Sequence, residues 1–229
     1  MEQYNLISEK IELDSSMQMI KKIGEHGFIF PSNITREMFA YMLFHSAGTY
    51  EKICSSNSPD KLDEILSEMV DALFEANNQA YYWELKKYIL EHYPQDDVFL
   101  ENIRQIFDAY ERELYYPCLC GLFPIIERLL SDSEDPHMKR FDRLLEKKEK
   151  SISENISDNE ENRLYLQNLS GFISYVSKTS SFSDTEPEGA NRHWFLHGRT
   201  NRVVKQSDCS KIFLAIQALL ELLKDETNI

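Results

Sequence analysis

Glycine and proline are scarce in this chain of 229 residues, which contains 7 of each. Glycine therefore makes up less than half of its usual share of about 7%. Folds that need many tight turns depend on glycine, as do nucleotide sites in which a glycine-rich loop cradles the phosphates. The composition therefore argues against β-sandwiches, β-barrels and sites of that kind.

Cysteines and long apolar runs are also few. The four cysteines form no Cys-x-x-Cys pair, and Cys118 and Cys120 lie in an apolar stretch, where packed thiols are expected rather than metal ligands. No apolar run is long enough to span a membrane, and the first residues include Glu2, whereas a secretory signal begins with basic residues. These features predict a cytoplasmic protein without a membrane partner, bound metal or cofactor.

Acidic residues outnumber basic ones by 39 to 25, which gives a formal net charge of −14. A negative surface repels nucleic acid and anionic membranes at long range. Any such partner must therefore meet a local basic patch.

Apolar residues recur at helical spacing along most of the sequence, which predicts an all-α protein. Helices are expected after Pro31, over residues 60–77 and 78–92, and in a second unit that begins near Gln95. Within that unit, residues 118–127 are apolar nearly all round, so we expect them to form the most buried helix. We predict a smaller N-terminal helical region of unknown role (1–94) followed by an antiparallel helical bundle (95–229).

A polar segment before the last helix contains the residues best suited to chemistry. It reads Asn-Arg-His-Trp-Phe-Leu-His-Gly-Arg-Thr-Asn-Arg from Asn191 to Arg202. Residues 191–211 hold five cationic side chains and a single acid. This local positive charge can bind phosphate within an otherwise acidic protein.

The stretch from Arg192 to His197 fits the Arg-x4-His signature of HEPN domains, and it resembles the version found in bacterial and phage-defence proteins. Upstream, residues 115–127 resemble the buried helix of the same family, an aromatic-led apolar run that ends in an acid. The resemblance covers roughly Gln95 to Lys224.

The resemblance implies a bundle of four or five helices that dimerises with the two motifs facing each other. It also implies a metal-independent endoribonuclease that acts as a toxin or phage-defence effector, with an antitoxin or regulatory protein as a further partner. The RNA is expected to bind at residues 191–211.

The residue types suit RNA cleavage by the 2′-hydroxyl of the substrate. Histidine titrates near neutral pH and can act as base or acid, and arginine presents a charged fork that fits phosphate oxygens. We therefore predict Arg192, His197 and His193 as catalytic residues, with His193 orienting the arginine or the phosphate. The predicted substrate-binding residues are Asn191, Arg199, Arg202 and Lys205.

Helix geometry favours two copies of the chain. Five residues of α-helix place Arg192 and His197 about 140° apart around the axis, whereas His193 and His197 share a face. The guanidinium of Arg192 and the imidazole of His197 in one copy of the motif therefore do not readily contact the same phosphate. A homodimer in which two motifs form one composite site would allow this contact.

The residues of this motif could also have purely structural roles. His197 could be hydrogen-bonded inside the bundle, and Arg192 could form a buried ion pair with an acid such as Glu127. Asn191 is most simply a helix N-cap, and residues 194–195 are expected in the core rather than as platforms for nucleobases.

Three other functions remain open. A catalytically inactive HEPN-like module could bind a protein through the acidic surface. The same arginine and histidines could act on a small phosphorylated nucleotide. The His193 and His197 pair could also bind zinc, although no third ligand is spaced nearby.

Overall fold

The computed structural model describes residues 20–30, 59–93, 97–130, 159–177, 185–186 and 189–227. Within these ranges all regular elements are helices, so the predicted all-α fold is confirmed. None of the described helices is both long and apolar enough to cross a membrane. The helix expected after Pro31 lies outside the described residues.

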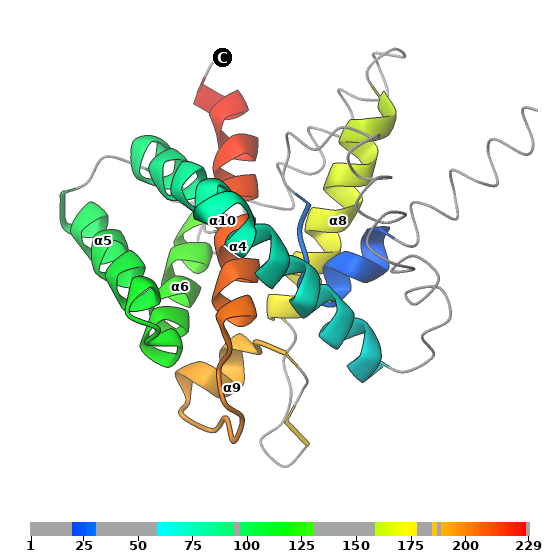
Figure 1. The fold of residues 1–229 in the computed structure, drawn as a ribbon. Coiled ribbons are helices and arrows are strands. Elements are labelled where there is room, and N and C mark those ends of the chain that lie inside the picture. The colour runs from blue at the N-terminus through cyan, green and yellow to red at the C-terminus, as the bar shows by residue number, and fades with distance from the viewer. Residues whose placement is uncertain are drawn as a thin grey trace, which may run out of the picture.

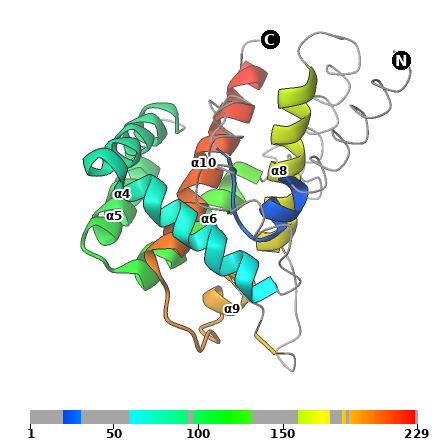
Figure 2. The same ribbon diagram turned by 45° about the vertical axis from the view of Figure 1, so that its right-hand side comes forward.

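The helical bundle is arranged around the last helix, α10 (Gln206–Thr227). Helix α4 (Pro59–His92) crosses it, and α5 (Asp97–Glu111) and α6 (Tyr115–Leu130) form an antiparallel pair on one side. Helix α8 (Asn159–Ser177) lies on the other side (Figures 1 and 2). The short helix α9 (Arg192–Leu196) lies beside the end at which α10 begins.

Helix α4 consists of two helical halves joined at a break. Residues 76–79 leave the helical conformation there, and Asn77, Asn78 and Gln79 adopt positive φ angles of 49°, 56° and 63°. Asparagine tolerates this left-handed conformation better than most residues because its short side chain bonds locally. The two separate helices predicted over 60–77 and 78–92 are confirmed.

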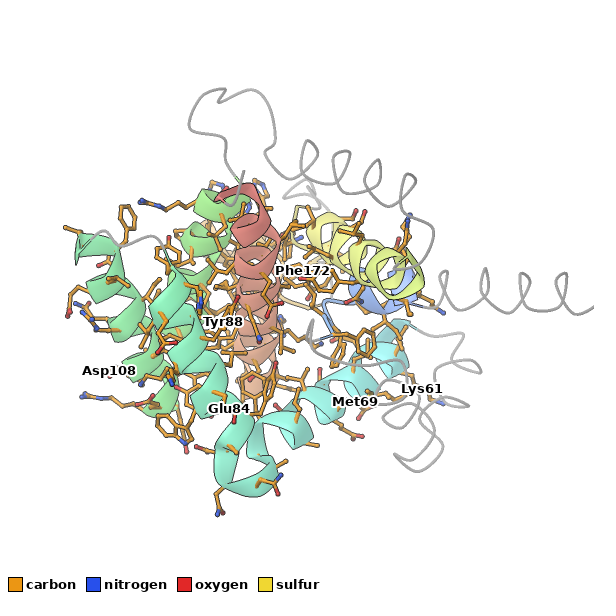
Figure 3. All side chains as sticks on the ribbon, turned by 90° about the horizontal axis from the view of Figure 1, so that it is seen from above. Lys61, Met69, Glu84, Tyr88, Asp108 and Phe172 are labelled. Atoms are coloured by element: carbon orange, nitrogen blue, oxygen red, sulfur yellow. The ribbon has the colours of Figure 1, made fainter. Side chains whose placement is uncertain are left out.

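Among the described helices α10 is the most buried, so the prediction that residues 118–127 form the most buried helix is wrong. Every residue from Ser207 to Leu220 is buried, whereas α6 exposes Tyr116, Pro124 and Glu127. Helix α10 packs against both α4 and α6, and side chains fill the space around it (Figure 3). Cys118 lies in the core as predicted.

One hydrophobic core joins the whole described structure. It contains Ile23 and Phe28 from the first segment, Leu66 from α4, and residues of every later helix. This core therefore continues across the predicted boundary between residues 94 and 95.

Two glycines allow the first segment to cross α8 closely. A Cβ atom at Gly24 would lie 2.1 Å from the carbonyl oxygen of Asn168, and one at Gly171 would lie 2.4 Å from that of Lys21. The buried Asn168 amide donates to the carbonyls of Ile20 and Phe28, at 3.1 and 3.0 Å. Residues 20–30 are therefore fixed to α8 by backbone contact as well as by apolar packing.

Candidate nuclease site around helix α9

Local capping explains why α9 forms with only five residues. The buried Asn191 side chain accepts a hydrogen bond from the Trp194 backbone at 3.2 Å, so the N-cap interpretation is confirmed. After the helix, Gly198 adopts a φ of +62°, and the Arg199 amide donates to the Trp194 carbonyl at 2.9 Å. A left-handed glycine with this type of bond is a common helix end.

Two aromatic side chains of α9 fix it to the bundle. Trp194 and Phe195 are both buried, as the structural interpretation predicted. The Phe195 ring lies 6.0 Å from that of Phe123 and 6.1 Å from that of Tyr116, both on α6. Phe195 is therefore a core residue, and α9 is positioned by packing as well as by its caps.

The two histidines of the motif lie together. Their rings are 4.7 Å apart between centroids and meet edge to face, as expected for positions i and i+4. His197 is exposed and His193 is partly buried. The alternative in which His197 lies inside the bundle is therefore wrong.

Arg192 points towards helix α6, where its Nη1 atom forms an ion pair with Oε1 of Glu127. This confirms the partner proposed from the sequence, but the pair is not buried. The Arg192 and Glu127 side chains are 31% and 47% exposed to solvent. Solvent can thus reach the guanidinium as well as the exposed imidazole of His197.

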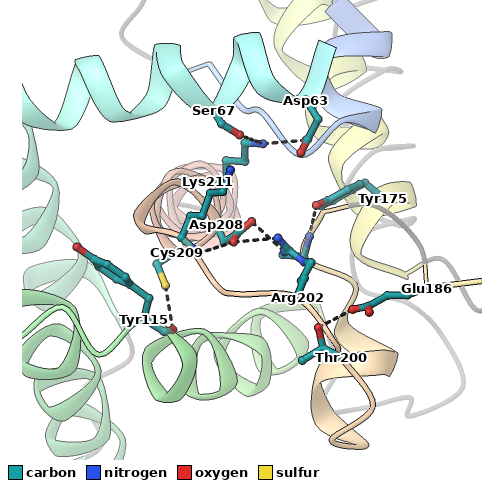
Figure 4. A network of polar contacts seen from close by, with 12 residues as sticks. Asp63, Ser67, Tyr115, Tyr175, Glu186, Thr200, Arg202, Asp208, Cys209 and Lys211 are labelled. Carbon is teal, nitrogen blue, oxygen red and sulfur yellow. Dashed lines mark hydrogen bonds and ion pairs between the residues drawn. The ribbon is translucent and has the colours of Figure 1, made fainter. Parts of the chain in front are cut away.

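Arg202 has a different environment from the one predicted. Its Nη2 and Nη1 atoms donate to the two carboxylate oxygens of Asp208, at 2.9 and 3.2 Å (Figure 4). The Asp208 side chain is only 7% exposed and also accepts from the Lys205 amide at 2.8 Å. Burial opposes the charge on Arg202, but Asp208 outweighs it and raises the pKa of the guanidinium. This arrangement makes Arg202 a structural residue rather than the predicted RNA contact.

Lys211 is likewise held inside the protein. Its Nζ atom lies 3.0 Å from Oδ1 of Asp63 and 3.1 Å from the hydroxyl of Ser67, both on α4 (Figure 4). Among the described residues, at least three of the five cationic side chains in residues 191–211 therefore contact a carboxylate of the same chain. The positive charge of this segment is smaller than the local sequence indicates, and Arg199 and Lys205 are its exposed cations.

Further polar contacts hold the segment that carries the motif. The Glu186 carboxylate accepts from the Thr200 hydroxyl and, at 2.9 Å, from the Asn201 amide. The Tyr175 hydroxyl accepts from the Ala190 amide, just before the N-cap (Figure 4). Burial raises the pKa of Tyr175, so this residue stays neutral. Sequence reasoning missed Glu186 and Tyr175, because neither stands in a recognisable pattern.

Metal ligands do not gather at this site. Within the part of the chain that the structure describes, no three His, Cys, Asp or Glu side chains are grouped so that they could hold an ion.

Comparisons with known proteins add no family. No protein-family model matches the chain, and no curated protein or solved structure shows significant similarity to it.

Proposed function

We propose that this protein is a metal-independent endoribonuclease of the HEPN type that acts in the cytoplasm. One observation carries the proposal: a single short helix, capped at both ends, brings Arg192 and His197 to solvent at the same end of the bundle. A guanidinium and an imidazole are the groups that cleavage by a 2′-hydroxyl requires. The resemblance of the motif to HEPN domains supports the same reaction.

The proposed reaction needs only the substrate and these side chains. One imidazole removes the proton from the 2′-hydroxyl, and the resulting oxygen attacks the adjacent phosphorus. The bond from phosphorus to the 5′-oxygen breaks, and a protonated imidazole donates a proton to that oxygen. The products are a 2′,3′-cyclic phosphate and a 5′-hydroxyl, while Arg192 stabilises the charge on the phosphate.

A homodimer is part of this proposal. Leu196 and Val203 expose 44% and 84% of their surface, and Tyr116 of α6 exposes 45% beside Phe195. Exposed apolar side chains next to the motif suit a contact between two copies. Such a contact would supply the second histidine and arginine of the composite site, with the exposed Arg199 and Lys205 at its edge.

A catalytically inactive interaction module is the second candidate. The ion pair between Arg192 and Glu127 favours it, because it gives the arginine a structural contact. The same exposed apolar residues and the net charge of −14 would then suit a protein partner, such as an antitoxin or a regulatory protein.

Cleavage of RNA by the purified protein in the presence of a chelator separates the two candidates. We expect the wild-type protein to cut RNA and the His197→Ala variant to lose at least 100-fold in rate, because its imidazole is the proposed acid or base. The matched control is His92→Ala, since His92 is also exposed but stacks on Tyr88 in α4. Equal cleavage by wild type and His197→Ala would exclude His197 from the mechanism, and no cleavage by either would favour the interaction module.

A further inference from the structure

Two arginine–carboxylate pairs flank α9, and they differ in a way that bears on phosphate binding. Arg202 and Asp208 form two parallel hydrogen bonds around a carboxylate that is 7% exposed. Arg192 and Glu127 also form an ion pair, but their side chains are 31% and 47% exposed. Water is largely excluded from the carboxylate of the first pair, whereas it reaches both side chains of the second.

Helix α6 keeps the Glu127 carboxylate near Arg192. The neighbouring residues Ile125, Ile126 and Leu129 are buried in the core, so the backbone at Glu127 is fixed. The side chain itself is 47% exposed and lies outside that packing. The carboxylate is thus tethered to the guanidinium and remains displaceable.

A carboxylate and a phosphodiester use the same donors of an arginine. Each presents two oxygens that share a negative charge and fit the guanidinium fork. An exposed ion pair is weak because water screens its attraction. A phosphodiester that is also held by neighbouring groups can replace the carboxylate at small cost.

We propose that Glu127 is a latch, a carboxylate that occupies Arg192 while no RNA is bound and is displaced by the phosphodiester of the substrate. This inference rests on the proposed function. Glu127 acts through Arg192 and takes no part in proton transfer. It lowers the affinity of Arg192 for every phosphate by the same factor, so weakly held isolated phosphate groups leave Glu127 in place whereas RNA that engages the whole site still displaces it.

Binding of an RNA that cannot be cleaved tests the latch. A 2′-O-methyl oligonucleotide lacks the attacking hydroxyl, so its affinity can be measured apart from catalysis. In Glu127→Gln the side chain keeps its shape and loses its charge, and we expect the affinity to rise about two- to fivefold. In cleavage assays with unmodified RNA the same variant should lower KM and leave kcat unchanged, because the carboxylate is displaced when the substrate binds and no longer occupies Arg192 during the reaction.

The matched control is Glu101→Gln on α5. Glu101 also forms an exposed ion pair, with Arg104 at 3.8 Å, so its replacement changes the net charge equally. We expect its affinity for the oligonucleotide to equal that of the wild type. In the Arg192→Gln background, Glu127→Gln should give no gain, because the group that the latch occupies is gone.

The outcomes distinguish the latch from the proposed function. If Arg192→Gln weakens binding but Glu127→Gln binds no tighter than Glu101→Gln, the latch is wrong and the function stands. If Glu127→Gln binds more weakly than the wild type, Glu127 holds Arg192 in place for the substrate, which also contradicts the latch. If no variant binds the oligonucleotide, the latch and the proposed function are both wrong.

Discussion

Removal of the Asp208 carboxylate should strongly destabilise the protein. In Asp208→Ala, the Arg202 guanidinium loses two hydrogen bonds and the Lys205 amide loses one, while the guanidinium stays largely inside the protein. Breaking a buried ion pair from one side costs about 3–5 kcal/mol. Because the Arg202 side chain is 26% exposed, we expect a loss near the lower end, about 3 kcal/mol.

Urea unfolding followed by circular dichroism measures this loss directly. Glu101→Ala serves as the control, since it removes an exposed ion pair and should change the free energy of unfolding by less than about 0.5 kcal/mol. The double variant Arg202→Met with Asp208→Ala should be more stable than Asp208→Ala alone, because it leaves no unpaired buried charge. A loss below about 1 kcal/mol for Asp208→Ala would refute the view that this pair holds the α9 segment.

Three further predictions concern single residues. Burial, together with Glu75, raises the pKa of Asp71 from 3.8 to about 6, so its charge opposes folding above about pH 6 and does not below about pH 4. After allowance for solvent screening, Asp71→Asn should therefore stabilise the protein by about 1 kcal/mol at pH 8 and leave its stability unchanged at pH 3.5. Urea unfolding at the two pH values measures this difference, and an equal gain at both would contradict it. Asn191→Ala should cost about 1 kcal/mol through loss of the N-cap and speed hydrogen exchange at the Trp194 amide, and unchanged exchange there would count against it. Gly198→Ala should lower the free energy of unfolding by about 1–2 kcal/mol in thermal unfolding, because alanine disfavours a φ of +62°. The new Cβ would meet no neighbouring atom, so backbone strain is the whole cost, and a neutral effect would show that the helix end can rearrange.

Local features of the fold were predictable from the sequence. The break in α4 coincides with adjacent asparagines between two apolar repeats, and the start of α9 coincides with a residue that caps its own helix. Each depends on neighbours within four residues along the chain. Such short-range preferences are readable without knowledge of the tertiary structure.

The central position of α10 was not predictable in the same way, because its buried polar residues have distant partners. Ser210 bonds to the Tyr110 hydroxyl at 2.8 Å, and Gln217 bonds to the Tyr81 hydroxyl at 3.0 Å. Read locally, serine, glutamine and lysine indicate an exposed face. Only the folded chain supplies the groups that satisfy them.

The charge of the candidate site was misjudged for the same reason. Asp63 lies 148 residues before Lys211, and no spacing rule connects the two. The pairing of Arg192 with Glu127 was foreseen as an alternative, but its exposure was not. A positive segment in the sequence therefore predicts a positive surface only after its intramolecular ion pairs are known.

Mass spectrometry of the cleavage products identifies the chemical group that attacks the phosphorus. A short RNA of defined sequence and its all-2′-deoxy counterpart are each incubated with the wild-type protein in a chelator. We expect that only the RNA is cut, that its fragments carry 2′,3′-cyclic phosphate and 5′-hydroxyl ends, and that His197→Ala produces neither. Cleavage of the deoxy strand, or fragments from RNA that carry 5′-phosphate ends, would contradict attack by the 2′-hydroxyl at the site around Arg192 and His197.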